Sequence, residues 1–167
     1  MILDTPTFEE SAASADEICA HLRACDRNFI PRLSGRLDIQ AYAEKIARHA
    51  ETFEAWFEGR LVGLVAAYLN DRDRQNGFVT SVSVEELFMG QGIAFVLFKS
   101  CLATAQRRKL KSMTLDVHKD NKRAIGFYRK FDFQMMDTTD DNTRMNLSLV
   151  SSEYPAMTGT GRDRNWP

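Results

Sequence analysis

The feature of this sequence that most constrains its fold is a strand pattern that passes through a glycine-containing turn into a helix pattern. Residues 78–84 (FVTSVSV) alternate small and β-branched side chains, as is typical of a strand. Gly90 and Gly92 follow, and apolar residues then recur at three- and four-residue steps over residues 93–105, which predicts a helix. The first amides of a helix lack partners within it and lie at the positive end of its dipole. The sequence therefore predicts a phosphate-binding turn at this junction.

Two common phosphate-binding motifs do not fit this turn. The dinucleotide fingerprint requires a small third residue so that helix and strand can pack closely, but Phe95 stands there. The nucleotide P-loop ends in Gly-Lys-Ser/Thr, and the chain contains no such sequence. The turn at residues 89–94 (MGQGIA) is therefore expected to hold the phosphates of a different ligand.

The remaining sequence predicts a mixed α/β fold of the α+β type and not a doubly wound sheet. Helix patterns occupy residues 8–24, with Ser11 or Ser14 as its N-cap, and residues 39–50, with Asp38 as the N-cap. Further strands are expected at residues 1–3, 52–57, 60–69, 111–117, 133–136 and 145–149, and a short helix at residues 124–131.

Composition indicates one domain over residues 1–150. From Ser151 the sequence is rich in Ser, Gly, Pro, Thr and charge, so residues 151–167 are predicted to form a flexible tail. The formal net charge of −1 gives no support to nucleic-acid or polybasic membrane binding. No apolar run approaches the ~20 residues that a membrane span needs.

The compartment is expected to be the cytoplasm. The first ten residues (MILDTPTFEE) lack the basic and apolar segments of a secretory signal. Cys19, Cys25 and Cys101 cannot all pair within one chain and do not have metal-ligand spacing. We therefore expect reduced thiols and no metal.

The turn resembles the acetyl-coenzyme A turn of the GCN5-related N-acetyltransferases (GNAT superfamily), written Q/R-x-x-G-x-G/A. Residues 89–94 fit this pattern except that Met89 replaces the usual Gln or Arg. In that family the contacts of the turn are largely backbone N–H groups to the pyrophosphate. The replacement is therefore expected to affect affinity or loop rigidity more than chemistry.

A second motif strengthens the resemblance. Residues 121–133 (NKRAIGFYRKFDF) are similar to the family pattern N-x-x-A-x-x-F-Y-x-K-x-G-F, with Asp132 in place of glycine. Asp tolerates the left-handed conformation at a helix C-terminus better than most residues. The resemblance covers about residues 52–149. It implies a mostly antiparallel central sheet with two splayed parallel strands in its middle and helices on both faces.

The resemblance also implies direct transfer of an acetyl group from acetyl-coenzyme A to a primary amine. A backbone N–H near Val84 is expected to donate a hydrogen bond to the thioester carbonyl. The side chain of Asn121 is expected to hydrogen-bond the pantetheine, although an ordinary role as helix N-cap also explains this residue. The residues expected to bind the coenzyme are Val82, Val84, Met89, Gly90, Gln91, Gly92, Ile93, Ala94, Asn121, Ala124 and Tyr128.

The resemblance makes Tyr128 the candidate general acid, because a phenol is protonated at neutral pH and can donate to the leaving sulfur. The alternative is that Tyr128 only packs on the sheet. For the base, a water oriented by Ser81 and Ser83 is the first candidate. Glu85 and His118 are weaker candidates, since a histidine at a strand end is often incidental.

The acceptor site is expected beside the loop at residues 25–38. This loop carries Phe29 and Arg32, and Tyr68 and Asn70 lie at the end of an apolar strand. Its three arginines favour an anionic acceptor, such as a phosphorylated or nucleotide-linked amino sugar, unless they are solvated charges. The alternatives are a protein or peptide N-acetyltransferase and a non-catalytic coenzyme A-binding module. The protein is expected to be a monomer or homodimer that binds neither nucleic acid nor membranes.

Overall fold

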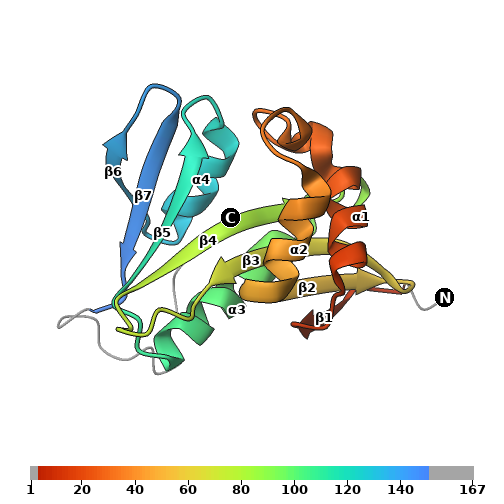
Figure 1. The fold of residues 1–167 in the computed structure, drawn as a ribbon, viewed down its shortest axis with the longest axis horizontal. Helices are drawn as coiled ribbons and strands as arrows, with labels where there is room; N and C mark the ends of the chain where they lie inside the picture. Colours follow the sequence, from red (N-terminus) through yellow and green to blue (C-terminus); the bar gives the residue numbers. More distant parts are fainter. Residues whose placement is uncertain (1–3, 151–167) are drawn as a thin grey trace.

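The computed structural model describes residues 4–150, which form one sheet with helices on both faces (Figure 1). The strands are β1 (Thr7–Glu10), β2 (Glu51–Phe57), β3 (Arg60–Tyr68), β4 (Asn76–Val84), β5 (Ser112–His118), β6 (Gln134–Thr138) and β7 (Asn142–Ser148). The helices are α1 (Ala15–Cys25), α2 (Ile39–His49), α3 (Ile93–Arg107) and α4 (Lys122–Lys130), with short 3₁₀ turns η1 (Asp26–Asn28), η2 (Leu33–Gly35) and η3 (Glu86–Phe88). The sheet order is β1-β2-β3-β4-β5-β7-β6.

The predicted fold class is confirmed, including the splayed central strands. Every neighbouring pair of strands is antiparallel except β4 and β5, which are parallel. These two strands pair only over residues 76–79 and 112–115. Beyond that point they diverge, and Figure 1 shows the opening between the end of β4 and the end of β5.

A β-bulge at Thr80 explains why the strands part. Ala67 pairs with Val79 and Ala66 with Ser81, so Thr80 has no partner on β3. A bulge bends a strand and increases its twist, and this one follows directly after the last β4–β5 pair, Val79 with Leu115. The carbonyl oxygen of Thr80 instead accepts a hydrogen bond of 2.7 Å from the hydroxyl of Tyr42 on α2.

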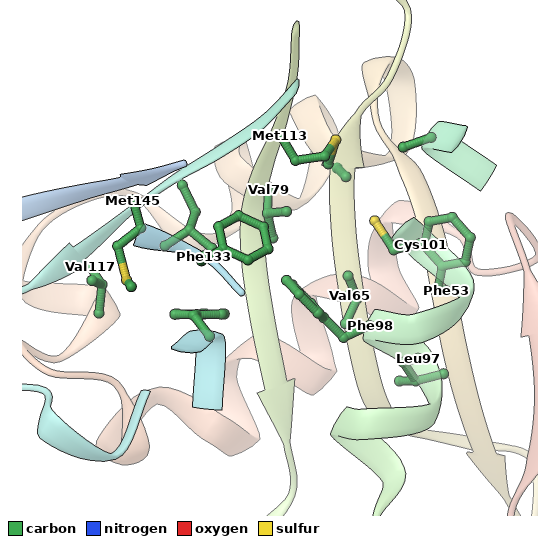
Figure 2. Packing of buried hydrophobic residues seen from close by; sticks show 14 of the residues in the cluster. Phe53, Val65, Val79, Leu97, Phe98, Cys101, Met113, Val117, Phe133 and Met145 are labelled. Atoms are coloured by element: carbon green, nitrogen blue, oxygen red, sulfur yellow. The ribbon is translucent and has the colours of Figure 1, made fainter. Parts of the chain in front are cut away.

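Two hydrophobic clusters hold the layers together. On one face of the sheet, α3 packs Leu97, Phe98 and Cys101 against strand residues (Figure 2). The ring centroid of Phe98 lies 5.7 Å from that of Phe133, which joins α3 to the segment after α4. On the other face, α1 and α2 pack on β3 through the residues Ile18, Leu22, Ala43, Ile46, Leu64 and Ala66.

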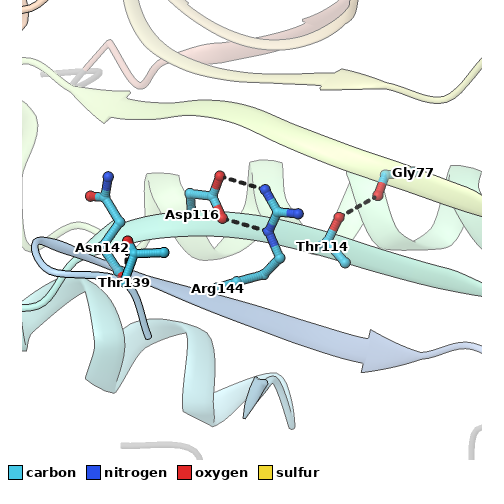
Figure 3. A network of polar contacts seen from close by, with 6 residues as sticks. All are labelled: Gly77, Thr114, Asp116, Thr139, Asn142 and Arg144. Atoms are coloured by element: carbon cyan, nitrogen blue, oxygen red, sulfur yellow. Dashed lines mark hydrogen bonds and ion pairs between the residues drawn. The ribbon is translucent and has the colours of Figure 1, made fainter. Parts of the chain in front are cut away.

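In Figure 1, α1 and α2 lie over the half of the sheet formed by β1 to β4, and β5 and β7 carry the exposed polar residues Asp116 and Arg144. Arg144 donates two hydrogen bonds to the carboxylate of Asp116, at 2.8 and 2.9 Å (Figure 3). Thr114 donates to the carbonyl oxygen of Gly77 at 3.4 Å, where β4 and β5 still pair. These contacts join β7 to β5 and β5 to β4.

The prediction of a helix from residue 8 is wrong at its start. Residues 7–10 form β1, which pairs with β2, and α1 begins only after Ser14. Ser14 accepts from the Glu17 amide and the Glu17 carboxylate accepts from the Ser14 amide, a capping box. The carboxylate of Glu54 holds the amides of Ala12 and Ala13 at 3.1 and 3.0 Å. These contacts fix the chain in a non-helical path before the cap.

The other predicted elements are confirmed, with small changes at their ends. Asp38 caps α2 by accepting from the amide of Ala41 at 2.8 Å. β2 and β3 form a hairpin that turns at Glu58 and Gly59. Both residues have positive φ, as this tight turn requires. The strand expected at residues 1–3 and the tail expected at residues 151–167 lie outside the described residues.

Candidate active site

A cleft of about 770 Å³ lies where β4 and β5 part. One side is formed by the last residues of β4, the other by α4, and the glycine turn with the start of α3 forms one end. Cys25 at the end of α1, together with Asn28 and Phe29, closes the cleft at the opposite face of the sheet. Residues far apart in the sequence therefore meet around one cavity.

The glycine turn presents free backbone amides to this cleft. Gly90 and Gly92 have φ of 79° and 78°, and Gly92 caps α3 without a side-chain hydrogen bond. An added Cβ at either glycine would meet no atom within 4 Å, so the need for glycine is conformational and not steric. Gly63 of β3 lets the turn lie close to the sheet. A Cβ at position 63 would come within 2.8 Å of the Cγ2 atom of Ile93, so the absence of a side chain leaves room for Ile93.

Helix α4 brings a polar cap and a buried phenol to the cleft. The Oδ1 atom of Asn121 accepts a hydrogen bond from the backbone amide of Ala124 at 3.2 Å. The Nδ2 atom is then the remaining polar group of the Asn121 side chain. About two turns after Asn121, Tyr128 packs its ring against Phe98, with ring centroids 5.5 Å apart, and lines the cleft. Burial raises the pKa of the Tyr128 phenol well above its ordinary value, so the group keeps its proton at neutral pH.

Cations lie along the same helix. Lys122, Arg123 and Lys130 line the cleft. A guanidinium nitrogen of Arg123 lies 4.0 Å from the sulfur of Met89, at the first position of the glycine turn. Arg123 therefore adds a positive charge beside the glycine turn, an arrangement that suits a phosphorylated ligand.

Sequence reasoning missed one polar group beside the cleft, the imidazole of His21. Its Nδ1 lies 3.0 Å from the carbonyl oxygen of Leu61 and its Nε2 lies 2.9 Å from the hydroxyl of Ser83, which lines the cleft. Burial lowers the pKa of His21 to about 4. Burial, together with the nearby Glu85 carboxylate, raises the pKa of the Cys25 thiol to about 12. A polar residue within an amphipathic helix was the only signal in the sequence.

Most of the predicted site residues meet at the cleft. Those that line it are Phe29, Val82, Val84, Met89, Gly90, Gly92, Ile93, Ala94, Asn121, Ala124 and Tyr128. The remaining predicted residues are not among its lining, namely Arg32, Tyr68, Asn70, Glu85, Gln91 and His118.

The predicted residues outside the lining have other contacts. The carboxylate of Glu85 is largely buried and pairs with Arg60 at 3.0 Å. His118 accepts from the amide of Asp120 at 3.2 Å through Nδ1. Arg32 is exposed and pairs with Asp26 at 3.7 Å, and Tyr68 lies beneath the ammonium of Lys45, 5.8 Å from its ring centre. Asn70 is exposed.

Parted parallel strands, a glycine turn at the start of α3 and a protonated phenol on α4 border one cleft. The chain matches the acetyltransferase (GNAT) family over residues 15–133, and it belongs to this family. The protein is therefore an acetyltransferase, and its family implies acetyl transfer from acetyl-coenzyme A. No curated protein matches the chain.

Solved structures share the fold at low sequence identity. Ard1 from Thermoplasma volcanium is 20% identical with a TM-score of 0.70, covering 89% of this chain and 100% of its own. The ribosomal-protein-S18-alanine N-acetyltransferase from Escherichia coli is 16% identical with a TM-score of 0.65, covering 89% and 99%. The PaiA N-acetyltransferase from Thermoplasma acidophilum, in complex with coenzyme A, is 12% identical with a TM-score of 0.65, covering 85% and 99%. Within residues 4–150 no helix has the length and apolar character to cross a membrane.

Proposed function

We propose that this protein transfers the acetyl group of acetyl-coenzyme A directly to the primary amine of a small molecule. The observation that carries the proposal is that free amides at the start of α3 and the Tyr128 phenol line the same cleft between parted strands. When bound, acetyl-coenzyme A would supply the acetyl group as a thioester.

The residues of the cleft fit this co-substrate. A pyrophosphate needs several backbone N–H donors without side chains in the way, and the turn at residues 90–94 offers them with positive-φ glycines. Val82 and Val84 lie on the end of β4 that pairs with β3 but no longer with β5, so the edge that faces β5 can pair with an extended pantetheine. We assign the remaining contacts to Met89, Gln91, Ile93, Ala94, Asn121 and Ala124.

Tyr128 is assigned as the general acid. Its hydroxyl belongs to a residue that lines the cleft, and burial raises the pKa of the phenol, so the group is protonated at neutral pH when the thioester is attacked. The departing sulfur develops negative charge as the C–S bond breaks, and it can accept this proton. Tyr128 therefore protonates the leaving group.

For the base we keep the path through water at Ser83 ahead of Glu85 and His118. Ser83 lines the cleft. The carboxylate of Glu85 is held by Arg60, and His118 lies at the end of β5 with its Nδ1 bound to the backbone. Neither side chain is among the residues that line the cleft, so either would need an intervening water to reach the amine.

The loop after α1 favours a small acceptor over a peptide. Asp26 accepts hydrogen bonds from the amide and the hydroxyl of Ser34 at 2.7 and 2.8 Å, which ties the two ends of the loop together. This places Asn28 and Phe29 on the cleft. A peptide acceptor would require this closed loop to move. An anionic acceptor draws no support from Arg32, because it pairs with Asp26.

We further propose a cytoplasmic enzyme, since the three cysteines are free thiols. The function is tested by incubating the protein with acetyl-coenzyme A and a panel of glucosamine 6-phosphate, tyramine, spermidine, free amino acids and short peptides. Formation of an N-acetylated small amine, with release of free coenzyme A, is the expected result. Coenzyme binding without transfer to any amine would identify a non-catalytic module, and transfer to peptides alone would identify a protein acetyltransferase.

A further inference from the structure

The imidazole of His21 connects the protein interior to the cleft. Its side chain, on α1, is 1% exposed and both of its nitrogens have polar neighbours. Nδ1 lies 3.0 Å from the Leu61 carbonyl oxygen on β3 and Nε2 lies 2.9 Å from the Ser83 hydroxyl on β4. His21 therefore links α1 to β4, the strand that borders the cleft.

The neighbours of His21 determine its tautomer. A carbonyl oxygen can only accept a hydrogen bond, so Nδ1 must carry the proton that is donated to Leu61. In the neutral ring Nε2 is then unprotonated and must accept from the hydroxyl of Ser83. The Ser83 proton therefore points inward to His21, and the Ser83 oxygen can accept from the Cys25 thiol and from one donor in the cleft.

The surroundings keep the His21 ring neutral, so its Nε2 is unprotonated before the reaction. Burial lowers the pKa of His21 to about 4, and the Sγ atom of Cys25 lies 3.7 Å from its Nε2 as a protonated thiol. The nearest charges are the Glu85 carboxylate, which acts on Cys25, and Arg60, which pairs with Glu85 at 3.0 Å. Because Ser83 and Cys25 both line the cleft, a bound amine can approach the Ser83 oxygen directly or through one water.

We propose that Ser83 and His21 form a proton relay that removes the proton from the acceptor amine during acetyl transfer, a role that rests on the proposed function. As the new C–N bond forms, a proton of the amine passes to the oxygen of Ser83. The Ser83 hydroxyl proton passes at the same time to Nε2 of His21. The C–S bond breaks, and its electron pair on sulfur takes the proton of Tyr128. The imidazolium and phenolate then return to neutrality by exchanging one proton through solvent.

The buried position of His21 gives the imidazolium a short lifetime, which suits a relay. A charge in a desolvated site is unfavourable, so the proton is returned rapidly once the amide has formed. A structural role alone would predict only that the contact joins α1 to β3 and β4. The two roles differ in what an added base does to a variant that lacks the histidine.

The test compares His21→Gln and Ser83→Ala with His49→Gln, which removes an exposed histidine at the end of α2. The acceptor is the amine of the panel above that the wild type acetylates fastest, and the acetylated product is measured with 0 to ~100 mM imidazole. We expect product formation to fall on the order of 100-fold in both relay variants. Affinity for coenzyme A is expected to change less than about threefold, and imidazole should restore part of the rate in His21→Gln only.

A second measurement needs no turnover. Nitrogen-15 chemical shifts of the His21 ring in the free protein should show a protonated Nδ1 and a hydrogen-bonded, unprotonated Nε2, and the Nε2 signal should move in Ser83→Ala. A protonated Nε2 would overturn the relay. So would unchanged rates in both variants, or rates that fall in parallel with coenzyme affinity and do not respond to imidazole.

The two proposals fail in different ways. If the wild type acetylates no amine of the panel, the proposed function fails and the relay with it. If the wild type is active and the relay variants match His49→Gln, the function stands and the relay is overturned. If His21→Gln does not fold, the relay is tested with Ser83→Ala alone, through its rate of acetyl transfer, its affinity for coenzyme A and the chemical shift of the His21 Nε2.

Discussion

The backbone N–H of Phe133 donates a hydrogen bond of 3.2 Å to the carbonyl oxygen of Tyr128. Asp132, between the end of α4 and Phe133, has φ of 69°, and its amide donates to Arg129 at 3.0 Å. These two bonds form a Schellman motif, which ends a helix through one residue in the left-handed conformation. The end of α4, and with it the backbone of Tyr128, is thus fixed by a residue in a conformation that favours glycine.

Asp132→Gly is expected to stabilise the protein. A non-glycine residue in the left-handed region costs about 1 kcal/mol or more, and glycine removes that cost at the price of a more flexible unfolded chain. We expect a gain of about 0.5–1 kcal/mol in the free energy of unfolding, measured by urea denaturation. Asp132→Val should lose at least as much, and a Gly variant less stable than the wild type would contradict the cap.

Gly92→Ala should weaken coenzyme A binding about tenfold, because the substitution strains the turn by roughly 1–2 kcal/mol. Gly59→Ala is the matched control. Gly59 has φ of 73° in the β2–β3 turn, away from the cleft, and its added Cβ also meets nothing within 4 Å. Both variants should lose similar stability, whereas calorimetric titration should detect weaker binding only in Gly92→Ala. Equal affinities in the two variants would remove the turn from the site.

Tyr128→Phe should lower the turnover of acetyl transfer on the order of 100-fold while coenzyme A affinity changes little. The aromatic ring is retained without its hydroxyl, so the packing against Phe98 is preserved. Phe131→Leu is the control variant. The ring centroid of Phe131 lies 4.8 Å from that of Phe98, so this substitution alters the same aromatic cluster but removes no hydroxyl. Turnover of Tyr128→Phe within threefold of the wild type would exclude the acid role.

Glu54→Ala should destabilise the protein by about 3 kcal/mol or more, because four donors, of which the Thr52 hydroxyl is buried, lose their acceptor. The fully buried Glu54 carboxylate accepts from the amides of Ala12 and Ala13, from the hydroxyl of Thr52 at 2.5 Å and from the indole of Trp56 at 2.9 Å. The exposed Glu44 on α2 serves as control, since Glu44→Ala is expected to cost less than about 0.5 kcal/mol. Similar unfolding midpoints for the two variants would be inconsistent with this anchoring role.

Stability should fall in mildly acidic solution because of His21. Its pKa is lowered from 6.5 to about 4 in the folded protein, so the folded state binds fewer protons than the unfolded state between these values. This contribution is complete above pH 6.5 and is lost as the pH falls toward 4. Between pH 7 and pH 5 it amounts to about 2 kcal/mol.

The measurement is urea unfolding at pH 7, 6 and 5. Carboxylates also titrate in this range, so the wild type is compared with His21→Gln, which should lose less stability on acidification. His49→Gln, at an exposed position, should follow the wild type. An equal slope in the wild type and His21→Gln would show that His21 is not buried in the neutral form.

Local signals in the sequence predicted much of the fold and most of the residues that line the cleft. The turn at Gly90 and Gly92, the caps at Asp38 and Asn121 and the left-handed Asp132 all depend on residues within a few positions of one another. Their spacing follows from helix and turn geometry, so pattern reasoning reaches them.

The features that the sequence did not predict depend on long-range contacts. His21 meets Ser83 across 62 positions and Glu54 meets Ala12 across 42. Nothing in the neighbourhood of either residue indicates its partner, because α1 reaches the sheet only through tertiary packing. The strand β1 was missed for the same reason, since its backbone hydrogen bonds are made to β2 and not within residues 7–10.

The central claim is that coenzyme A binds between the parted ends of β4 and β5 with its pyrophosphate on the first amides of α3. Amide chemical-shift mapping during titration with coenzyme A tests it most directly. The largest changes should fall on residues 82–84, 90–94 and 121–124, with saturation at or below ~1 mM. No change at that concentration, or changes centred on β1 and β2, would contradict the account.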